Sequence, residues 1–221
     1  MKKYLVKLVC CFIPFKSWRK KLRQHFIKIN PVKYIGRSSI NKNVIFEGQA
    51  TVFPGVRIKA DDFGSIKVGN NVIIGKNSII ATNKNHIYGG NPNNCKIIIG
   101  ENTSIGPNNQ FSGQGGIKIG KDVLFASNVI LMTNNHGYKD ITKPIRLQDN
   151  INKEISIGDD SWIGINVIIL GGVSIGRHCV IGAGSVVSKD IPDFCIAAGN
   201  PAKIVKKYNF EKNEWVKYVK E

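Results

Sequence analysis

A six-residue period organises the second half of the chain. From residue 155 to residue 187 an aliphatic side chain recurs at every sixth position, namely Ile157, Ile163, Ile169, Ile175, Ile181 and Val187. This period fits neither an amphipathic helix nor an alternating strand, and it is typical of a repeating coil. Three hexads predict one triangular turn of a parallel β-helix, with the aliphatic residue inside and the coils about 4.8 Å apart.

Two other positions of the hexad support this prediction. Four residues after each aliphatic residue stands a small or compact side chain: Ser161, Val167, Val173, Cys179 and Ser185. Glycine directly follows four of the aliphatic residues, at positions 158, 164, 176 and 182. Because glycine enters positive φ without a Cβ penalty, we expect these glycines to bend the backbone at the corners.

The period extends back to residue 40 with four departures, at 59–67, 81–98, 112–118 and 132–156. Each departure follows the third hexad of a coil, so all four loops should leave the prism at one corner. Loops stacked along one edge of a rigid rod form a cleft wall, where functional residues gather. The two long loops, 81–98 and 132–156, carry His86 and His136, which we expect about 10 Å apart along the axis.

The two remaining histidines are expected to have ordinary surface roles. His178 lies in the middle of a hexad and should point outward from a flat face, and His25 belongs to the basic N-terminal segment. Five cysteines show no metal-ligand spacing, so no metal is expected. Cys179 occupies a core slot of a hexad, which indicates a reduced, cytoplasmic protein.

Positive charge is concentrated at the N-terminus. The chain has 32 Lys and Arg against 15 Asp and Glu, a formal charge of +17 that favours an anionic partner. No nucleic-acid motif is present, so nucleic acid is not the expected partner. Residues 1–30 hold nine Lys or Arg and no acid, beside an apolar stretch too short to span a bilayer. Two interpretations stay open: a peripheral contact with the anionic inner face of the cytoplasmic membrane, and a helix that caps the β-helix.

The repeat ends after Val187. Pro192 and Pro201 cannot continue a strand ladder, so the chain should fold back as a loop before a tail of helical character that caps the last coil. The expected organisation is a basic segment (1–30), an all-β, β-helical domain (31–191) and a C-terminal loop and tail (192–221).

The second half of the chain also resembles a known family. The TNNHGY loop, the segment IGDDSWIGINVIIL, and the later GAGSVVSKDIP and AAGNPAKIVKK are similar to the hexapeptide-repeat O-acetyltransferases, especially those of galactosides, maltose, nodulation factors and polysaccharides. The similarity covers about residues 66–207. It implies a left-handed β-helix, a homotrimer, and acetyl-CoA bound in the groove between neighbouring chains.

The resemblance also implies roles for particular residues. His136 matches the general base, and Trp162 an aromatic residue beside the acetyl thioester. Ala183, Ser188 and Lys189 match positions that touch the pantetheine arm, and Lys203 and Lys206 match basic residues near the adenosine phosphates. The candidate acceptor contacts are His86 and two residues beside His136, namely Asn135 and Tyr138.

The chemistry of the residues agrees with acyl transfer to a hydroxyl. An alcohol is a poor nucleophile at neutral pH, and a histidine with a pKa near 6.5 suits a general base. The expected function is O-acetylation of a sugar hydroxyl in cell-surface polysaccharide or lipid-linked glycan synthesis. Alternatives are transfer to a sugar amine, serine or an antibiotic, a zinc hydratase on the same fold, and a non-catalytic scaffold.

Overall fold

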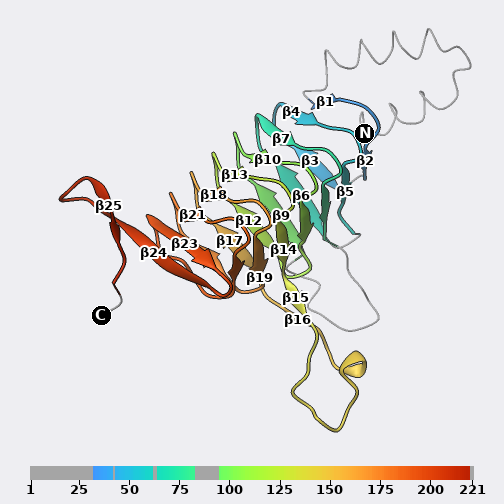
Figure 1. The fold of residues 1–221 in the computed structure, drawn as a ribbon. Coiled ribbons are helices and arrows are strands. Elements are labelled where there is room, and N and C mark those ends of the chain that lie inside the picture. The colour runs from blue at the N-terminus through green and yellow to red at the C-terminus, as the bar shows by residue number, and fades with distance from the viewer. Residues whose placement is uncertain (1–31, 42, 62–63, 83–94, 220–221) are drawn as a thin grey trace, which may run out of the picture.

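The computed structural model describes residues 32–41, 43–61, 64–82 and 95–219. Short strands wind into a rod of stacked coils, in which each coil contributes one strand to each of three sheets, and strands of successive coils are parallel (Figure 1). The predictions for residues 1–30, His25 and His86 lie outside the described residues. None of the helical segments in the described ranges has the length and apolar character that a membrane crossing requires.

The three sheets form the faces of the rod. Sheet A contains ten strands, in the order β1 (Val32–Tyr34), β4 (Ala50–Val52), β7 (Val72–Ile74), β10 (Ser104–Ile105), β13 (Leu124–Phe125), β18 (Trp162–Ile163), β21 (Val180–Ile181), β23 (Cys195–Gly199), β24 (Ala202–Asn209) and β25 (Glu214–Lys217). Sheet B contains β2 (Ser39–Ile40), β5 (Arg57–Lys59), β8 (Ile79–Ala81), β11 (Gln110–Ser112), β14 (Ile130–Met132), β19 (Ile168–Leu170) and β22 (Val186–Val187). Sheet C contains β3 (Val44–Phe46), β6 (Ser65–Val68), β9 (Lys96–Ile99), β12 (Ile117–Ile119), β17 (Ile155–Ile157) and β20 (Ser174–Ile175).

The chain visits the sheets in the order C, A, B, and the coils pair in register. Ile157 lies beside Ile175, Ile163 beside Ile181 and Ile169 beside Val187, as the six-residue period predicts. These side chains are 0–3% exposed and stack into one continuous core. The predicted left-handed parallel β-helix is confirmed.

The compact position of the hexad is also buried, and its polar members are satisfied. Ser161 and Ser185 are 1% and 0% exposed. The Ser161 hydroxyl donates to the carbonyl of Gly176 at 3.0 Å and accepts from the Cys179 amide at 3.0 Å. Buried hydroxyls therefore hydrogen-bond the corner backbone of the next coil, which removes the cost of burying them.

The expected role of the glycines after each aliphatic residue was wrong. Positive φ occurs two residues later, at Asp160 (55°), Asn166 (58°) and His178 (51°). A glycine is needed at position 158 for another reason, because a Cβ there would lie 2.6 Å from the amide nitrogen of Arg177 in the next coil. The corners thus combine glycine for close approach of two coils with Asn or Asp, which tolerate the left-handed conformation.

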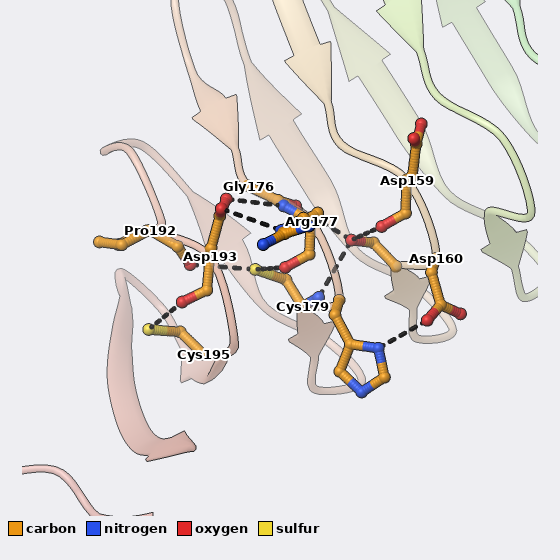
Figure 2. A network of polar contacts seen from close by, with 10 residues as sticks. Asp159, Asp160, Gly176, Arg177, Cys179, Pro192, Asp193 and Cys195 are labelled. Carbon is orange, nitrogen blue, oxygen red and sulfur yellow. Dashed lines mark hydrogen bonds and ion pairs between the residues drawn. The ribbon is translucent and has the colours of Figure 1, made fainter. Parts of the chain in front are cut away.

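The corner between sheets C and A shows how successive coils are joined (Figure 2). Asp193 accepts a hydrogen bond from the Arg177 amide at 2.9 Å and forms an ion pair with its guanidinium at 3.4 Å. The Cys179 thiol donates to the carbonyl of Pro192 at 3.1 Å. His178 lies at this corner rather than on a flat face, and its exposed ring contacts Asp160 at 2.6 Å.

The C-terminal tail is a β-hairpin, so the predicted helix was wrong. β24 runs antiparallel to β23, and β25 runs antiparallel to β24, which extends sheet A beyond the last coil (Figure 1). Tyr208 and Trp215 are directly paired, and Trp215 stacks on His178 with ring centroids 6.2 Å apart. The free edge of the last coil is therefore paired by strands rather than covered by a helix.

The prediction that the loops share one corner is confirmed. β5, β8, β11 and β14 of sheet B are each followed in the sheets by a sheet C strand, so the chain leaves and rejoins the rod at the edge between sheets B and C in all four departures. The longest of them projects from the rod as an arm (Figure 1). The arm contains the ribbon strands β15 (Asn134–Asn135) and β16 (Ile151–Asn152) and the 3-10 helix η3 (Ile145–Leu147).

Candidate active site

His136 lies at the base of the arm, where β15 and β16 form an antiparallel ribbon. Asn134 pairs with Asn152 and Asn135 with Ile151. The Gly137 amide donates to the carbonyl of Asp149 at 3.0 Å, so the same register continues past His136. A Cβ at position 137 would lie 2.5 Å from that carbonyl oxygen, which explains glycine after the histidine. The ribbon thus fixes the backbone of His136 while its side chain remains exposed.

One glutamine holds the arm in shape. The Gln148 amide donates to the carbonyls of Asp140 and Lys143 at 2.8 and 3.0 Å, and its oxygen accepts from the Asp140 amide at 3.1 Å. The Asp140 carboxylate accepts from the hydroxyl and the amide of Thr142, which lowers the pKa of Asp140. The arm is therefore an internally braced loop, although it buries little surface.

Several apolar side chains of the arm face solvent. Tyr138 is 67% exposed, Ile141 96%, Ile145 57% and Leu147 59%. Several exposed apolar residues on one projecting segment are typical of a contact surface. The predicted acceptor contacts Asn135 and Tyr138 flank His136 here and are both exposed.

Trp162 lies on the outer face of sheet A, in a row of directly paired positions that reaches it from Ser104 through Leu124. The row continues through Val180 and Ile196 to Lys206 on β24 and Lys217 on β25. Trp162 is 50% exposed, Val180 and Ile196 are half-buried, and both lysines are exposed. The row from Trp162 to Lys217 spans four strand spacings, about 19 Å. Its first three positions form an apolar track of about 10 Å, and the last two carry neighbouring ammonium groups.

The other predicted residues lie near the edges of the rod. Ala183 is exposed at the corner between sheets A and B, and Lys203 pairs with Ala198 near the same corner. Ser188 and Lys189 follow β22, so they lie on the edge between sheets B and C, the edge that also carries the arm. This edge is the one that does not border sheet A. Within one chain, His136 therefore lies on the same edge of the rod as Ser188 and Lys189. Trp162 and Lys206 lie on sheet A, away from this edge.

Sequence reasoning missed two sets of residues. Lys217 was placed in a helix, and only the hairpin register brings it beside Lys206. Asn150 and Asn152 were overlooked, yet the amide oxygens of both are buried in the arm's base without a hydrogen-bond partner. In the described ranges, no group of three His, Cys, Asp or Glu side chains is arranged to hold a metal ion.

Comparisons with known proteins agree with this geometry. Residues 154–189 match the bacterial transferase hexapeptide family (six repeats), and residues 96–132 match the hexapeptide repeat of succinyl-transferase. The crystal structure of the polySia specific acetyltransferase NeuO is 30% identical, with a TM-score of 0.50 over 80% of this chain and 76% of that one. The chain belongs to the hexapeptide-repeat transferase family.

Curated members of the hexapeptide-repeat family are similar over shorter spans. A protein of Mycobacterium tuberculosis named a probable acetyltransferase is 35% identical over 75% of this chain and 52% of its own length. The galactoside O-acetyltransferase of Escherichia coli (strain K12) is 36% identical over 62% of this chain and 64% of its own length. The matched segments thus span between half and two thirds of these relatives.

Proposed function

We propose that this protein is an acetyltransferase that moves an acetyl group from acetyl-CoA to a sugar hydroxyl, with His136 as general base. The acceptor would be a cell-surface polysaccharide or a lipid-linked glycan. The observation that carries the proposal is the position of His136, which a rigid ribbon holds exposed on the edge of a hexapeptide β-helix. The names of the relatives, which include acetyltransferases of galactosides and of polysialic acid, support the acceptor class.

His136 has the chemistry that the reaction needs. An imidazole with a pKa near 6.5 is partly unprotonated at neutral pH and accepts a proton from a hydroxyl within hydrogen-bonding reach. Such a base contributes about 10²–10⁴ in rate. Asn135 and Tyr138 adjoin it along the chain, and we assign them, with His86, to acceptor binding.

The outer face of sheet A fits the donor. Acetyl-CoA supplies an activated thioester at the end of an extended pantetheine arm, and anionic phosphates at the other end. A pantetheine arm has about the length of five extended residues, roughly 17 Å. The row from Trp162 to Lys217 has a similar total length, about 19 Å, with apolar side chains over its first half and two positive charges at its end. We also assign a pantetheine contact to Ala183 and a further phosphate contact to Lys203, which lie at the border of sheet A. Ser188 and Lys189 lie on the opposite edge, so we assign them to the pantetheine arm of a donor bound to a neighbouring chain.

The separation of the two sets of residues supports a homotrimer. In one chain the edge with His136 lies opposite sheet A, so a donor on that sheet cannot reach the base. A neighbouring chain could supply its own edge and arm, and the exposed apolar residues of the arm, such as Ile141 and Leu147, suit a contact between chains. In this arrangement each site takes its base from one chain and its donor row from the next.

The proposal is tested with purified full-length protein, acetyl-CoA and a panel of acceptors. The panel contains galactosides, glucosides, sialic acid oligomers, an amino sugar and serine, and products are identified by mass spectrometry. We expect O-acetylation of one sugar, and a fall in kcat of about 10²–10⁴ in His136→Gln with unchanged calorimetric affinity for CoA. Unchanged turnover in an intact His136→Gln oligomer would reject the base, and absence of CoA binding would favour the scaffold alternative.

A further inference from the structure

Two buried amide oxygens stand unpaired at the base of the arm. They are Oδ1 of Asn150 and Oδ1 of Asn152. A buried acceptor without a donor costs about 1–3 kcal/mol, so such groups are rare and each needs an explanation. Which end of an asparagine amide is oxygen, and which nitrogen of a histidine carries the proton, depend on the hydrogen bonds that surround them. The explanation therefore lies in the donors that the fold places opposite these oxygens.

The register of the ribbon identifies those donors. The Lys153 amide donates to the carbonyl of Thr133 at 2.8 Å, and the Gly137 amide donates to that of Asp149 at 3.0 Å. Between these hydrogen-bonded pairs lie the pairs whose side chains approach most closely across an antiparallel ladder. Asn134 faces Asn152 in one of them. In the other, by the same register, His136 faces Asn150.

Each unpaired oxygen thus lies across the ribbon from a side chain that carries an N–H. Cβ atoms in such pairs are about 4.5–5.5 Å apart, within reach of an asparagine and an imidazole. The Asn134 oxygen already lies 3.5 Å from the Ser112 hydroxyl, which leaves its amide nitrogen available to Asn152. For Asn150, the N–H across the ribbon belongs to the imidazole of His136.

We propose that Asn150 is the positioning residue of His136. Its amide oxygen accepts a hydrogen bond from one ring N–H, which fixes the tautomer and leaves the lone pair of the other nitrogen directed at the acceptor hydroxyl. A neutral amide suits this task because it orients the ring without stabilising the imidazolium. A carboxylate in its place would stabilise the imidazolium. This inference rests on the proposed role of His136, and it assigns to Asn150 no contact with either substrate.

The direct test follows the imidazole itself and needs no activity. The chain has four histidines, so the His136 resonances can be assigned in ¹H–¹⁵N spectra by comparison with His136→Gln. We expect one neutral tautomer in the wild-type protein at high pH and a mixture of both in Asn150→Ala. We also expect Asn150→Asp to raise the pKa of His136, because the new carboxylate favours the protonated ring. The other charged residues of the ribbon and arm, which include Lys139, Asp140, Asp149 and Lys153, are the same in these proteins.

Two variants serve as matched controls. Asn152→Asp places the same charge one pair further along the same face of the ribbon, and should shift the His136 pKa less than Asn150→Asp does. Asp149→Asn changes a charge beside Asn150 on the opposite face, and should leave the tautomer unchanged. An unchanged tautomer in Asn150→Ala, or equal shifts from the two Asp variants, would overturn the proposal whether or not His136 is catalytic.

Activity gives a second readout. We expect kcat to fall about 10–100-fold in Asn150→Ala, with an unchanged KM for acetyl-CoA, since the base is present but not oriented. In Asn150→Asp the acid limb of the kcat/KM profile should move to higher pH, because the unprotonated base is lost at a higher pH as the medium is acidified. A tautomer change without any change in kcat would show that His136 is not the base, and would leave the positioning contact intact.

Discussion

Lys206 on β24 and Lys217 on β25 occupy directly paired positions on the outer face of sheet A, in the row that also contains Trp162. Two like charges placed side by side destabilise a strand pair, so their presence at the end of an apolar track supports the donor site proposed there. We expect Lys206→Gln and Lys217→Gln each to raise the KM for acetyl-CoA about tenfold, with kcat nearly unchanged.

The matched control for this pair is Lys207→Gln. Lys207 neighbours Lys206 on β24, pairs with Val216 and points to the other face of the hairpin. Its substitution should leave the KM unchanged. Equal effects of all three variants would indicate a general electrostatic attraction to a basic protein rather than a site in this row.

The corner glycines give a prediction about stability. A Cβ at position 158 would lie 2.6 Å from both the Arg177 amide nitrogen and the Gly176 carbonyl carbon, and backbone atoms cannot move aside as a flexible side chain does. We expect Gly158→Ala to destabilise the fold by about 1–3 kcal/mol, the usual cost of overpacking. The measurement is the midpoint of urea unfolding. Lys118→Ala, which removes an exposed ion pair with Glu154, is the control and should cost less than about 1 kcal/mol.

The interior of the rod could be predicted from the sequence because burial follows the six-residue period. The corners could not be predicted, because close approach of two coils is required at one position and the left-handed backbone conformation at another. A signal for the bend was present in the Asn or Asp that recurs three positions after the aliphatic residue, as at Asp160 and Asn166. Glycine is the residue usually associated with positive φ, so the bend was assigned to the glycines rather than to the Asn or Asp two positions later.

The hairpin and the base of the arm were beyond sequence reasoning for a related reason. Local pattern alone suggested a helix for the last residues, and the requirement to pair the free edge of β23 decided otherwise. His136 could be placed on an edge by counting hexads. Its partner Asn150, and the pairing of Lys206 with Lys217, depend on registers between strands that the sequence does not show.

The buried thiols give a prediction about pH. Burial raises the pKa of both Cys179 and Cys195, so at pH 8 less of each thiol is thiolate than in an unfolded chain. In a Cys10→Ser/Cys11→Ser variant, we expect both to react with iodoacetamide at least about tenfold more slowly than in urea, by mass spectrometry of the tryptic peptides. The rates should rise with pH above 9. Reaction at the unfolded rate in native protein would contradict a packed corner.

The proposed division of the site between chains gives the most direct prediction. His136→Gln removes the base, and Lys206→Gln/Lys217→Gln weakens the donor row, so each protein alone should be nearly inactive at low acetyl-CoA. If each site joins the edge of one chain to sheet A of its neighbour, trimers assembled from both variants contain some sites with two intact parts. Each mixed trimer then contains one intact site out of three, so the mixed trimers should show roughly a third of the wild-type activity.

The experiment uses co-expression of the two variants with different affinity tags and purification over both columns, so that only mixed oligomers are assayed. Light scattering establishes whether these oligomers are trimers. Mixtures of the separately purified variants serve as the control and should stay inactive unless chains exchange. Activity of the mixed oligomers no higher than the mean of the two parents would show that one chain supplies both parts, which would contradict the arrangement inferred from the opposite positions of His136 and Trp162 on the rod.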